Sequence, residues 1–128
     1  MKIGILGGSF DPAHKGHLVI SKEAKRRFKL EKIIWAVTKK NPLKAESKTP
    51  ISKKIKDCKK IIGLNSFIKV KFYENIIKSN KTIDLINYLK KNKNIEIFFL
   101  MGADNLISFH KWYKWQKISL KCNILVFD

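Results

Sequence analysis

Five short apolar runs recur along the chain, and a stretch with helical spacing follows each of the first four. The run IEIFFLMG, from Ile95 to Gly102, is almost continuously apolar, which is typical of a central parallel strand buried on both faces. The other runs are KIGIL, KIIWAVT, FIKVKFYE and CNILVFD. Regular alternation of strands and helices implies βαβ units with right-handed crossovers. The sequence therefore predicts an α/β fold with a doubly wound parallel sheet of about five strands and helices on both faces.

The linking stretches predict helices from the spacing of their apolar residues. In HLVISKEAKRRF the apolar residues near helical spacing are Leu18, Val19, Ala24 and Phe28. A second helix is expected over residues 51–64. In the third, KTIDLINYLKKN, Thr82 is expected to be the N-cap, and Asp84 suits the positive first turn. The stretch NPLKAESKTP predicts a loop, and NLISFHKWYKWQKI predicts short helical turns.

The composition is that of a single soluble domain. At 128 residues the chain has the length of one domain, and its 45% hydrophobic content is ordinary. No apolar run approaches the ~20 residues that span a membrane. Gly7 and Gly8 interrupt the apolar start, so we expect no signal peptide and a cytoplasmic protein. Cys58 and Cys122 are far apart and lack CxxC spacing, so two free thiols are expected rather than a disulfide or zinc site.

The formal net charge of +18 suggests a polyanionic partner such as nucleic acid. The excess is almost entirely lysine, spread from end to end and accompanied by many isoleucines and asparagines. This pattern is typical of a genome-wide codon bias rather than of a binding patch. We therefore expect a solvated lysine-rich surface rather than a nucleic-acid-binding protein, in which a few lysines can still meet an anionic substrate.

Three polar stretches directly follow predicted strands, and they are GGSFDPAH, TKKNPLK and GADN. In open parallel sheets the ligand binds in the crevice outside the carboxyl ends of the strands. The topology therefore brings these three stretches to one rim, where we expect a single site.

The stretch GGSFDPAHKGHL is suited to holding a phosphate group. Gly7 and Gly8 let the backbone turn sharply and let a phosphate approach the amide groups. A helix is expected to begin near His17, and a helix N-terminus carries about half a positive charge. His14 and His17 are three residues apart, so both imidazoles can donate hydrogen bonds to phosphate oxygens in one pocket.

Other interpretations of this stretch fit less well. The dinucleotide fingerprint GxGxxG and the P-loop pattern GxxxxGKS/T are both absent. The HxxH spacing can hold a metal, but Asp11 is the only nearby third ligand. Zinc takes a fuller set, so we expect no protein-held metal here.

Longer motifs carry a family resemblance. GGSFDPAHKGHL resembles the GxFDPxHxGH signature of the HxGH nucleotidyltransferase superfamily, which is a long and specific pattern. FFLMGADNLISFHKWYKW resembles the GADNL…F…W segment of bacterial nicotinate-nucleotide adenylyltransferases. NPLK and KTIDLI resemble further family positions, the latter with Leu85 where the family usually has Thr. The resemblance covers the chain from Lys2 onward and implies a Rossmann-like fold in a single nucleotidyltransferase domain, residues 1–128.

The resemblance implies two groups of ligand contacts. His14 and His17 would be the catalytic pair on the ATP phosphates, with His17 nearer to the reacting α-phosphate. The ATP-binding residues that it implies are Gly8, Ser9, Phe10, His14, His17 and Lys44. The residues that it implies for nicotinate mononucleotide are Thr82, Asp104, Trp112 and Tyr113. Trp112 would stack on the pyridine ring of this acceptor.

The implied reaction is adenylyl transfer from ATP to nicotinate mononucleotide, giving nicotinate adenine dinucleotide and pyrophosphate for NAD biosynthesis. The acceptor phosphate is already anionic, so no general base is required. Catalysis would then depend on positioning and electrostatic stabilisation, with Mg²⁺ offsetting charge on the phosphates.

Several of these residues also have a purely structural interpretation. Thr82 can serve as an N-cap, and Asp104 can cap the helix that follows its strand. Trp112 and Tyr113 can be packing aromatics, and Lys44 can be a solvated loop cation.

The family usually continues into a C-terminal segment with an ISSTxIR-type motif that holds adenine, and these 128 residues contain no such motif. We expect a truncated chain or a degenerate remnant, whose last strand would leave an apolar patch open to homo-oligomerisation. Two alternative functions remain at this point. One is a sister adenylyltransferase with another phosphorylated acceptor, and the other is a non-catalytic cationic binding module.

Overall fold

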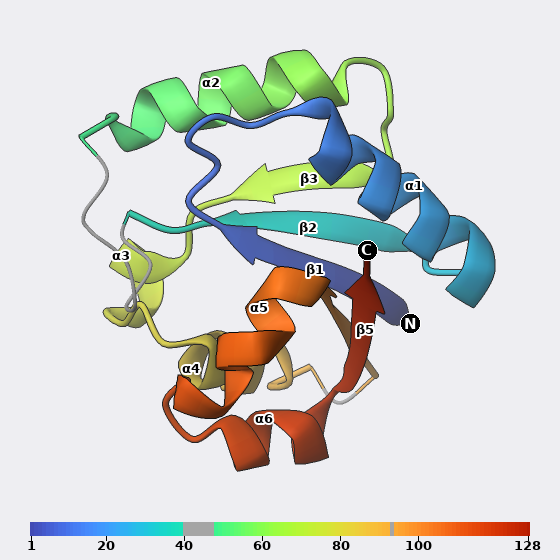
Figure 1. Cartoon of the computed structure of the whole chain (residues 1–128), viewed down its shortest axis with the longest axis vertical. Helices are drawn as coiled ribbons and strands as arrows, with labels where there is room; N and C mark the ends of the chain where they lie inside the picture. The colour runs from blue at the N-terminus through green and yellow to red at the C-terminus, as the bar shows by residue number, and fades with distance from the viewer. Residues whose placement is uncertain (40–47, 93) are drawn as a thin grey trace.

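The computed structural model describes residues 1–39, 48–92 and 94–128, and in this part of the chain five parallel strands form one sheet. The strands are β1 (Lys2–Gly8), β2 (Lys32–Val37), β3 (Ile68–Lys71), β4 (Glu96–Gly102) and β5 (Asn123–Phe127). They lie in the order β3-β2-β1-β4-β5 (Figure 1). The predicted α/β fold with a parallel sheet of about five strands is confirmed.

The direction of travel through the sheet reverses at β1. The chain first runs outward from β1 through β2 to β3, and then returns to the other side of β1 to form β4 and β5. β1 therefore pairs with β2 on one side and with β4 on the other, which places Gly8 beside Val37 and Ile5 beside Phe99. A crevice opens beyond the carboxyl ends of two strands whose connections leave in opposite directions. This topology prepares a binding site next to Gly8.

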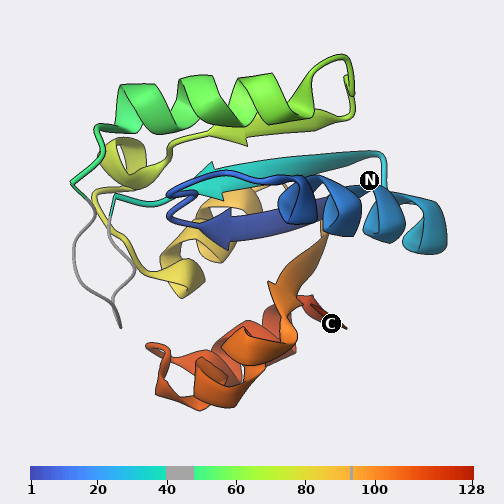
Figure 2. The same ribbon diagram turned by 45° about the horizontal axis from the view of Figure 1, so that its top comes forward.

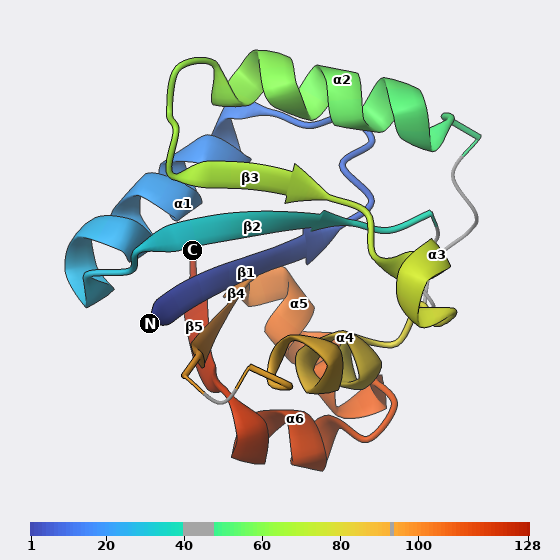
Figure 3. The same ribbon diagram turned by 180° about the vertical axis from the view of Figure 1, so that it is seen from behind.

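Helices cover both faces of the sheet. They are α1 (Lys15–Phe28), α2 (Ile51–Ile62), α3 (Glu74–Ile77), α4 (Thr82–Leu89), α5 (Ala103–Ser108), α6 (Trp115–Lys121) and a 3-10 turn, η1 (Phe109–Lys111). Residues of α1 and α2 join the core on one face, and residues of α4, η1 and α6 join the core on the other. Figure 2 and Figure 3 show α2 and α6 at opposite ends of the molecule. Within the described ranges, no helix combines the length and apolar character needed to cross a bilayer.

The alternation of side chains along β2 divides the core into two layers. Ile33, Trp35 and Val37 belong to the layer under α1 and α2. Ile34 and Ala36 belong to the layer under α4 and α6. Since both faces of β2 are covered, the strand is apolar throughout rather than alternating, as parallel strands in α/β proteins are.

The two cysteines lie on opposite sides of the sheet. Cys58 is buried in the α1–α2 layer, and Cys122 is half-buried against the α4–α6 layer. Both are free thiols, because the sheet stands between them.

The buried face of α1 differs from the prediction. Val19 is 64% exposed, and the fully buried residues of this helix are Ser21 and Ala24. A serine can face the core here because its hydroxyl donates to the His17 carbonyl oxygen (2.8 Å) and accepts from Trp35 Nε1 (2.8 Å). Hydrophobic spacing could not identify Ser21 as a core residue, since the reason lies in its hydrogen bonds.

The strand predicted in FIKVKFYE is shorter than expected. β3 ends at Lys71, where its pairing with Ala36 near the end of β2 also stops. Glu74 then begins the short helix α3 instead of continuing the strand. The reason is that its carboxylate accepts hydrogen bonds from Thr38 and Lys39, the two residues that follow β2.

The predicted N-cap of α4 was also wrong by one residue. Lys81 is the cap residue, and Thr82 is the first residue of the helix. The hydroxyl of Ser79 accepts from the Lys81 amide (3.0 Å) and donates to the Asp84 carboxylate (2.6 Å). Ser79 therefore fixes the turn into α4, and Asp84 lies in the first turn as predicted.

Candidate active site

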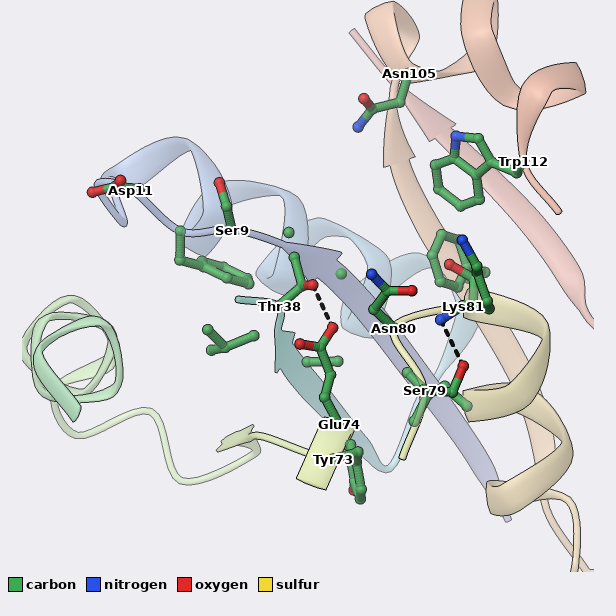
Figure 4. A pocket seen from close by; sticks show the side chains of 18 of the residues that line it. Ser9, Asp11, Thr38, Tyr73, Glu74, Ser79, Asn80, Lys81, Asn105 and Trp112 are labelled. Atoms are coloured by element: carbon green, nitrogen blue, oxygen red, sulfur yellow. Dashed lines mark hydrogen bonds between the residues drawn. The ribbon is translucent and has the colours of Figure 1, made fainter. Parts of the chain in front are cut away.

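A cavity of about 670 Å³ opens at the carboxyl ends of β1, β2 and β4. Its lining comes from Phe99 of β4 and from residues within four segments, 7–17, 36–38, 73–85 and 104–113. Figure 4 shows Asn105 and Trp112 on one side of the cavity and Thr38 and Glu74 on the other. The predicted stretches GGSFDPAH and GADN meet here, and Thr38, one of the two described residues of TKKNPLK, also lines the cavity. Lys44, predicted to bind ATP, lies outside the described residues.

His14 and His17 form a reciprocal cap at the start of α1, which begins at Lys15, slightly before the predicted start. Nδ1 of His14 accepts from the Gly16 amide (3.1 Å), and Nδ1 of His17 accepts from the His14 amide (3.1 Å). The two rings stack with their centroids 3.9 Å apart. A Cβ atom on Gly16 would lie 2.8 Å from Cε1 of His14, so a larger residue would displace this ring.

These hydrogen bonds decide which nitrogen of each imidazole carries the proton. A neutral imidazole has one donor and one acceptor nitrogen, and Nδ1 is the acceptor in both rings. Nε2–H is therefore the donor on both. Burial, reinforced by the neighbouring His14, lowers the pKa of His17 from 6.5 to about 4. At neutral pH His17 is an uncharged N–H donor near the positive end of α1, and both histidines line the cavity.

The ring of His17 rests on an aromatic support that sequence reasoning missed. The Phe10 ring lies 4.6 Å from that of His17 and stacks on Trp35 at 5.2 Å, with the two planes 17° apart. Trp35 is fully buried, and its indole N–H donates to Ser21. Phe10, which was predicted to contact ATP, lines the cavity although the residue is only 3% exposed, and its ring also supports His17 from the core side. The signal was present in the sequence, because a tryptophan in a buried strand needs a partner for its N–H.

The opposite wall of the cavity contains Trp112. Its indole packs edge-on against Phe99 (centroids 5.7 Å apart, 85°) and Phe109 (5.3 Å, 71°). These contacts join Trp112 to the α4–α6 core layer, and the same residue also lines the cavity. The packing and ligand-contact interpretations of this residue are therefore compatible.

The other residues predicted on the acceptor side converge on the same cavity. Thr82 lies at the start of α4, and Asp104 lies in the first turn of α5. Tyr113 also lines the cavity, with 54% of its surface exposed. Thr82 is 22 residues before Asp104 in the sequence, and the fold brings the two segments together.

Polar residues from a further segment were missed by sequence reasoning. Glu74, Ser79, Asn80 and Lys81 all line the cavity (Figure 4). They follow β3, whose carboxyl end lies on the same rim as the other strands. No motif marks these four residues, although their position after a parallel strand was a usable signal.

The described ranges contain no group of three or more His, Cys, Asp or Glu side chains that could hold a metal ion. Asp11 lies in the cavity, where its carboxylate accepts from Thr49 Oγ1 (2.8 Å). Mg²⁺ prefers an octahedron of oxygens that includes water and substrate phosphates. The residues present therefore fit a metal that arrives on a nucleotide better than one held by the protein.

Comparisons with known proteins agree with this geometry. A family model described as cytidylyltransferase-like matches residues 5–128. A relative from Pelagibacter ubique (strain HTCC1062), named probable nicotinate-nucleotide adenylyltransferase, is 69% identical over 127 residues, or 99% of this chain and 71% of the relative. The chain belongs to the nicotinate-nucleotide adenylyltransferase family. Another member of this family, from Bradyrhizobium sp. (strain ORS 278), is 36% identical over 129 residues, covering all of this chain and 67% of that relative.

The fold is shared with a solved structure of the Plasmodium falciparum nicotinic acid mononucleotide adenylyltransferase complexed with NaAD. The TM-score is 0.83 at 23% identity, over 98% of this chain and 63% of that one. The family and the Rossmann-like fold that the motifs implied are both confirmed. As a member of this adenylyltransferase family, the chain is a nucleotidyltransferase.

Proposed function

We propose that this chain transfers the adenylyl group of ATP to nicotinate mononucleotide and releases pyrophosphate. The observation that carries the proposal is the pair of Nε2–H donors at the N-terminus of α1, on the same cavity as Trp112. One wall is thus suited to phosphate and the other to a flat ring. The names of the Pelagibacter and Bradyrhizobium relatives support this assignment.

The ATP phosphates lie in this proposal against the loop from Gly8 to His17. Gly8 and Ser9 offer backbone groups at the end of β1, and His14 and His17 offer imidazole N–H groups. The positive end of α1 favours an anion at this place. Lys44 would add a cation to the same phosphates.

Nicotinate mononucleotide occupies the opposite wall in this proposal. Trp112 stacks on the pyridine ring in this proposal. Phe99 and Phe109 pack against its indole, so the ring is already oriented before the acceptor binds. Thr82, Asp104 and Tyr113 surround the rest of the acceptor. The result is a site in which both substrates approach the carboxyl ends of β1 and β4.

The chemistry needs little from the protein beyond placement and charge stabilisation. An oxygen of the acceptor phosphate attacks the α-phosphorus of ATP, and the bond from this phosphorus to the bridging oxygen breaks. Pyrophosphate leaves with the electron pair, and no proton has to be removed from the nucleophile. Charge builds on the oxygens around the α-phosphorus, where the N–H of neutral His17 is a prearranged donor.

A divalent metal belongs in this scheme as part of the nucleotide. We propose that Mg²⁺ enters with ATP, where it would offset phosphate charge. Asp11 and Asp104 line the cavity and would offer carboxylates to such an ion, while the described residues contain no group of three ligating side chains.

The decisive experiment is an acceptor assay on this chain. Pyrophosphate release is measured with ATP, Mg²⁺ and nicotinate mononucleotide, and the dinucleotide product is identified by chromatography. Nicotinamide mononucleotide and phosphopantetheine are assayed in parallel. Product from either of these alone would replace the proposal with a sister adenylyltransferase. No product, together with nucleic-acid binding that weakens steeply with salt, would favour the cationic binding module.

A further inference from the structure

Thr38, the residue directly after β2, is held in three directions. Its amide donates to the Gly8 carbonyl oxygen (2.9 Å), which ties it to the end of β1. Its carbonyl oxygen accepts from Lys54 Nζ (3.2 Å), and its hydroxyl donates to Glu74 Oε2 (2.5 Å; Figure 4). Thr38 therefore joins the phosphate side of the cavity to two helices that lie far away in the sequence.

Lys54 is an unusual component of this arrangement. It is the fourth residue of α2 and is only 1% exposed, on the face that also carries the buried Cys58. Burying an ammonium is costly unless it is hydrogen-bonded, and an apolar residue would fill this position without that cost. The Thr38 carbonyl is the acceptor that Lys54 reaches, and it gives this buried cation a specific role at the end of β2.

Glu74 completes the arrangement from the other side. Oε1 accepts from the Lys39 amide (3.0 Å) while Oε2 accepts from the Thr38 hydroxyl, so one carboxylate binds two consecutive residues. Glu74 is the first residue of α3, a helix of four residues with no buried residue of its own. The carboxylate is therefore the main described link that attaches α3, and the cavity segment behind it, to β2.

We propose that Lys54 and Glu74 are positioning residues that act through Thr38, and we call these three residues the Thr38 clamp. The clamp fixes the distance between the Gly8 loop, where ATP is proposed to bind, and the segment from Glu74 to Thr82, which forms part of the acceptor side. This proposal rests on the proposed function, because the clamp would set how the two proposed substrates face each other. None of the three residues needs to take part in bond making.

A loosened clamp is expected to affect turnover more than binding. Each substrate would keep its own contacts, so each KM would change little. The two substrates would meet less often in the reactive geometry, and misplacement by 1 Å can cost on the order of 10²-fold in rate. The expected signature is a fall of kcat on the order of 10-fold or more with smaller changes in both KM values.

Thr38 offers a matched pair of variants. Thr38→Val keeps the shape and both backbone bonds but removes the hydroxyl that donates to Glu74, whereas Thr38→Ser keeps the hydroxyl. We expect kcat to fall in Thr38→Val and to recover in Thr38→Ser. Glu23→Gln serves as the control and should keep wild-type kinetics, because Glu23 is a half-buried carboxylate on α1 that pairs with Arg26 and does not line the cavity. Equal kcat in Thr38→Val and wild type would overturn the proposal.

Combination of Thr38→Val with Glu74→Leu tests whether the two residues act through one contact. The double variant should lose no more activity than the worse single variant, because each change removes one partner of the same hydrogen bond. Additive losses would show that they act separately and would contradict the clamp. Lys54→Met should give the same split between kcat and KM, since the Thr38 carbonyl then loses its buried partner.

Amide hydrogen exchange measures the clamp without any reaction. The Thr38 and Lys39 amides should be protected in the wild type, and the Lys39 amide should exchange faster in Glu74→Leu, which removes its acceptor, at an unchanged melting temperature. Fast exchange of both amides in the wild type would overturn the clamp. If the wild type released no pyrophosphate while these amides remained protected, the proposed function would fail instead, and the two failures are thus distinguished.

Discussion

The amide of His14 donates to Nδ1 of His17, and the two imidazole rings stack with centroids 3.9 Å apart. Each histidine therefore uses its Nδ1 within the cap of α1 and keeps its Nε2–H for another partner. A metal would need a free ring nitrogen with a lone pair, and a phosphate needs an N–H. These hydrogen bonds therefore support the proposed role of the pair as phosphate donors.

His17→Ala is expected to lower kcat by about 10²-fold or more, the usual cost of losing one prearranged donor. The reason is that the contact strengthens as charge develops on the reacting phosphate. Steady-state pyrophosphate release measures this effect. His110→Ala is the control, because His110 is exposed in η1 and does not line the cavity, so its kcat should equal that of the wild type. Unchanged turnover in His17→Ala would remove His17 from the mechanism.

The pKa of His17 predicts how stability depends on pH. Burial and the nearby His14 lower this pKa to about 4 in the folded protein, against an ordinary value of 6.5. Between pH 4 and 6.5 the unfolded chain therefore binds more protons at this residue, so stability rises with pH through this window. The stability that the neutral imidazole of His17 contributes is fully present above pH 6.5 and is lost as the pH falls toward 4.

Chemical denaturation at pH 4.5, 5.5 and 7.0 tests this dependence by comparing the wild type with His17→Gln. The wild type should lose more stability than the variant between pH 7.0 and 4.5, because only the wild type carries the imidazole. Parallel losses in the two proteins would mean that His17 titrates at its ordinary pKa.

Trp112→Leu is expected to raise the KM for nicotinate mononucleotide while leaving the KM for ATP nearly unchanged, since the proposed ring stack is lost. It should also lower stability, because the aromatic pairs with Phe99 and Phe109 each contribute about 0.5–1.5 kcal/mol beyond buried area. Trp115→Phe is the matched control. Trp115 packs on Phe109 (5.9 Å) but does not line the cavity, so this variant should keep both KM values.

Ser21→Ala is expected to destabilise the fold by about 1–3 kcal/mol, the cost of leaving a buried polar group without a partner. The indole N–H of Trp35 donates to Ser21 in a fully buried position. Urea denaturation measures the loss. In a Trp35→Phe background the same substitution should cost less, because no indole N–H is left unpaired there. An equal cost in both backgrounds would show that this hydrogen bond contributes little.

Much of the site was predictable because its signals are local. Gly7, Gly8, His14 and His17 lie within 11 residues, where the capping geometry depends on neighbours along the chain. The polar residues after the apolar run of β4 were predictable for a similar reason, since parallel strands end on one rim. The exposure of Val19 was not predictable. The side of α1 that faces the sheet includes Ser21, whose burial depends on its hydrogen bonds with the His17 carbonyl and with Trp35.

By itself the sequence determined the order of strands and helices, the family motifs and the rim on which the site lies, because these depend on short-range patterns and on topology. Only the tertiary structure decided that Ser21 supports Trp35 and that Lys54 and Glu74 meet at Thr38. The partners in these contacts are 14, 16 and 36 residues apart. A polar residue is buried when a distant partner satisfies it, and neither composition nor periodicity specifies where that partner lies.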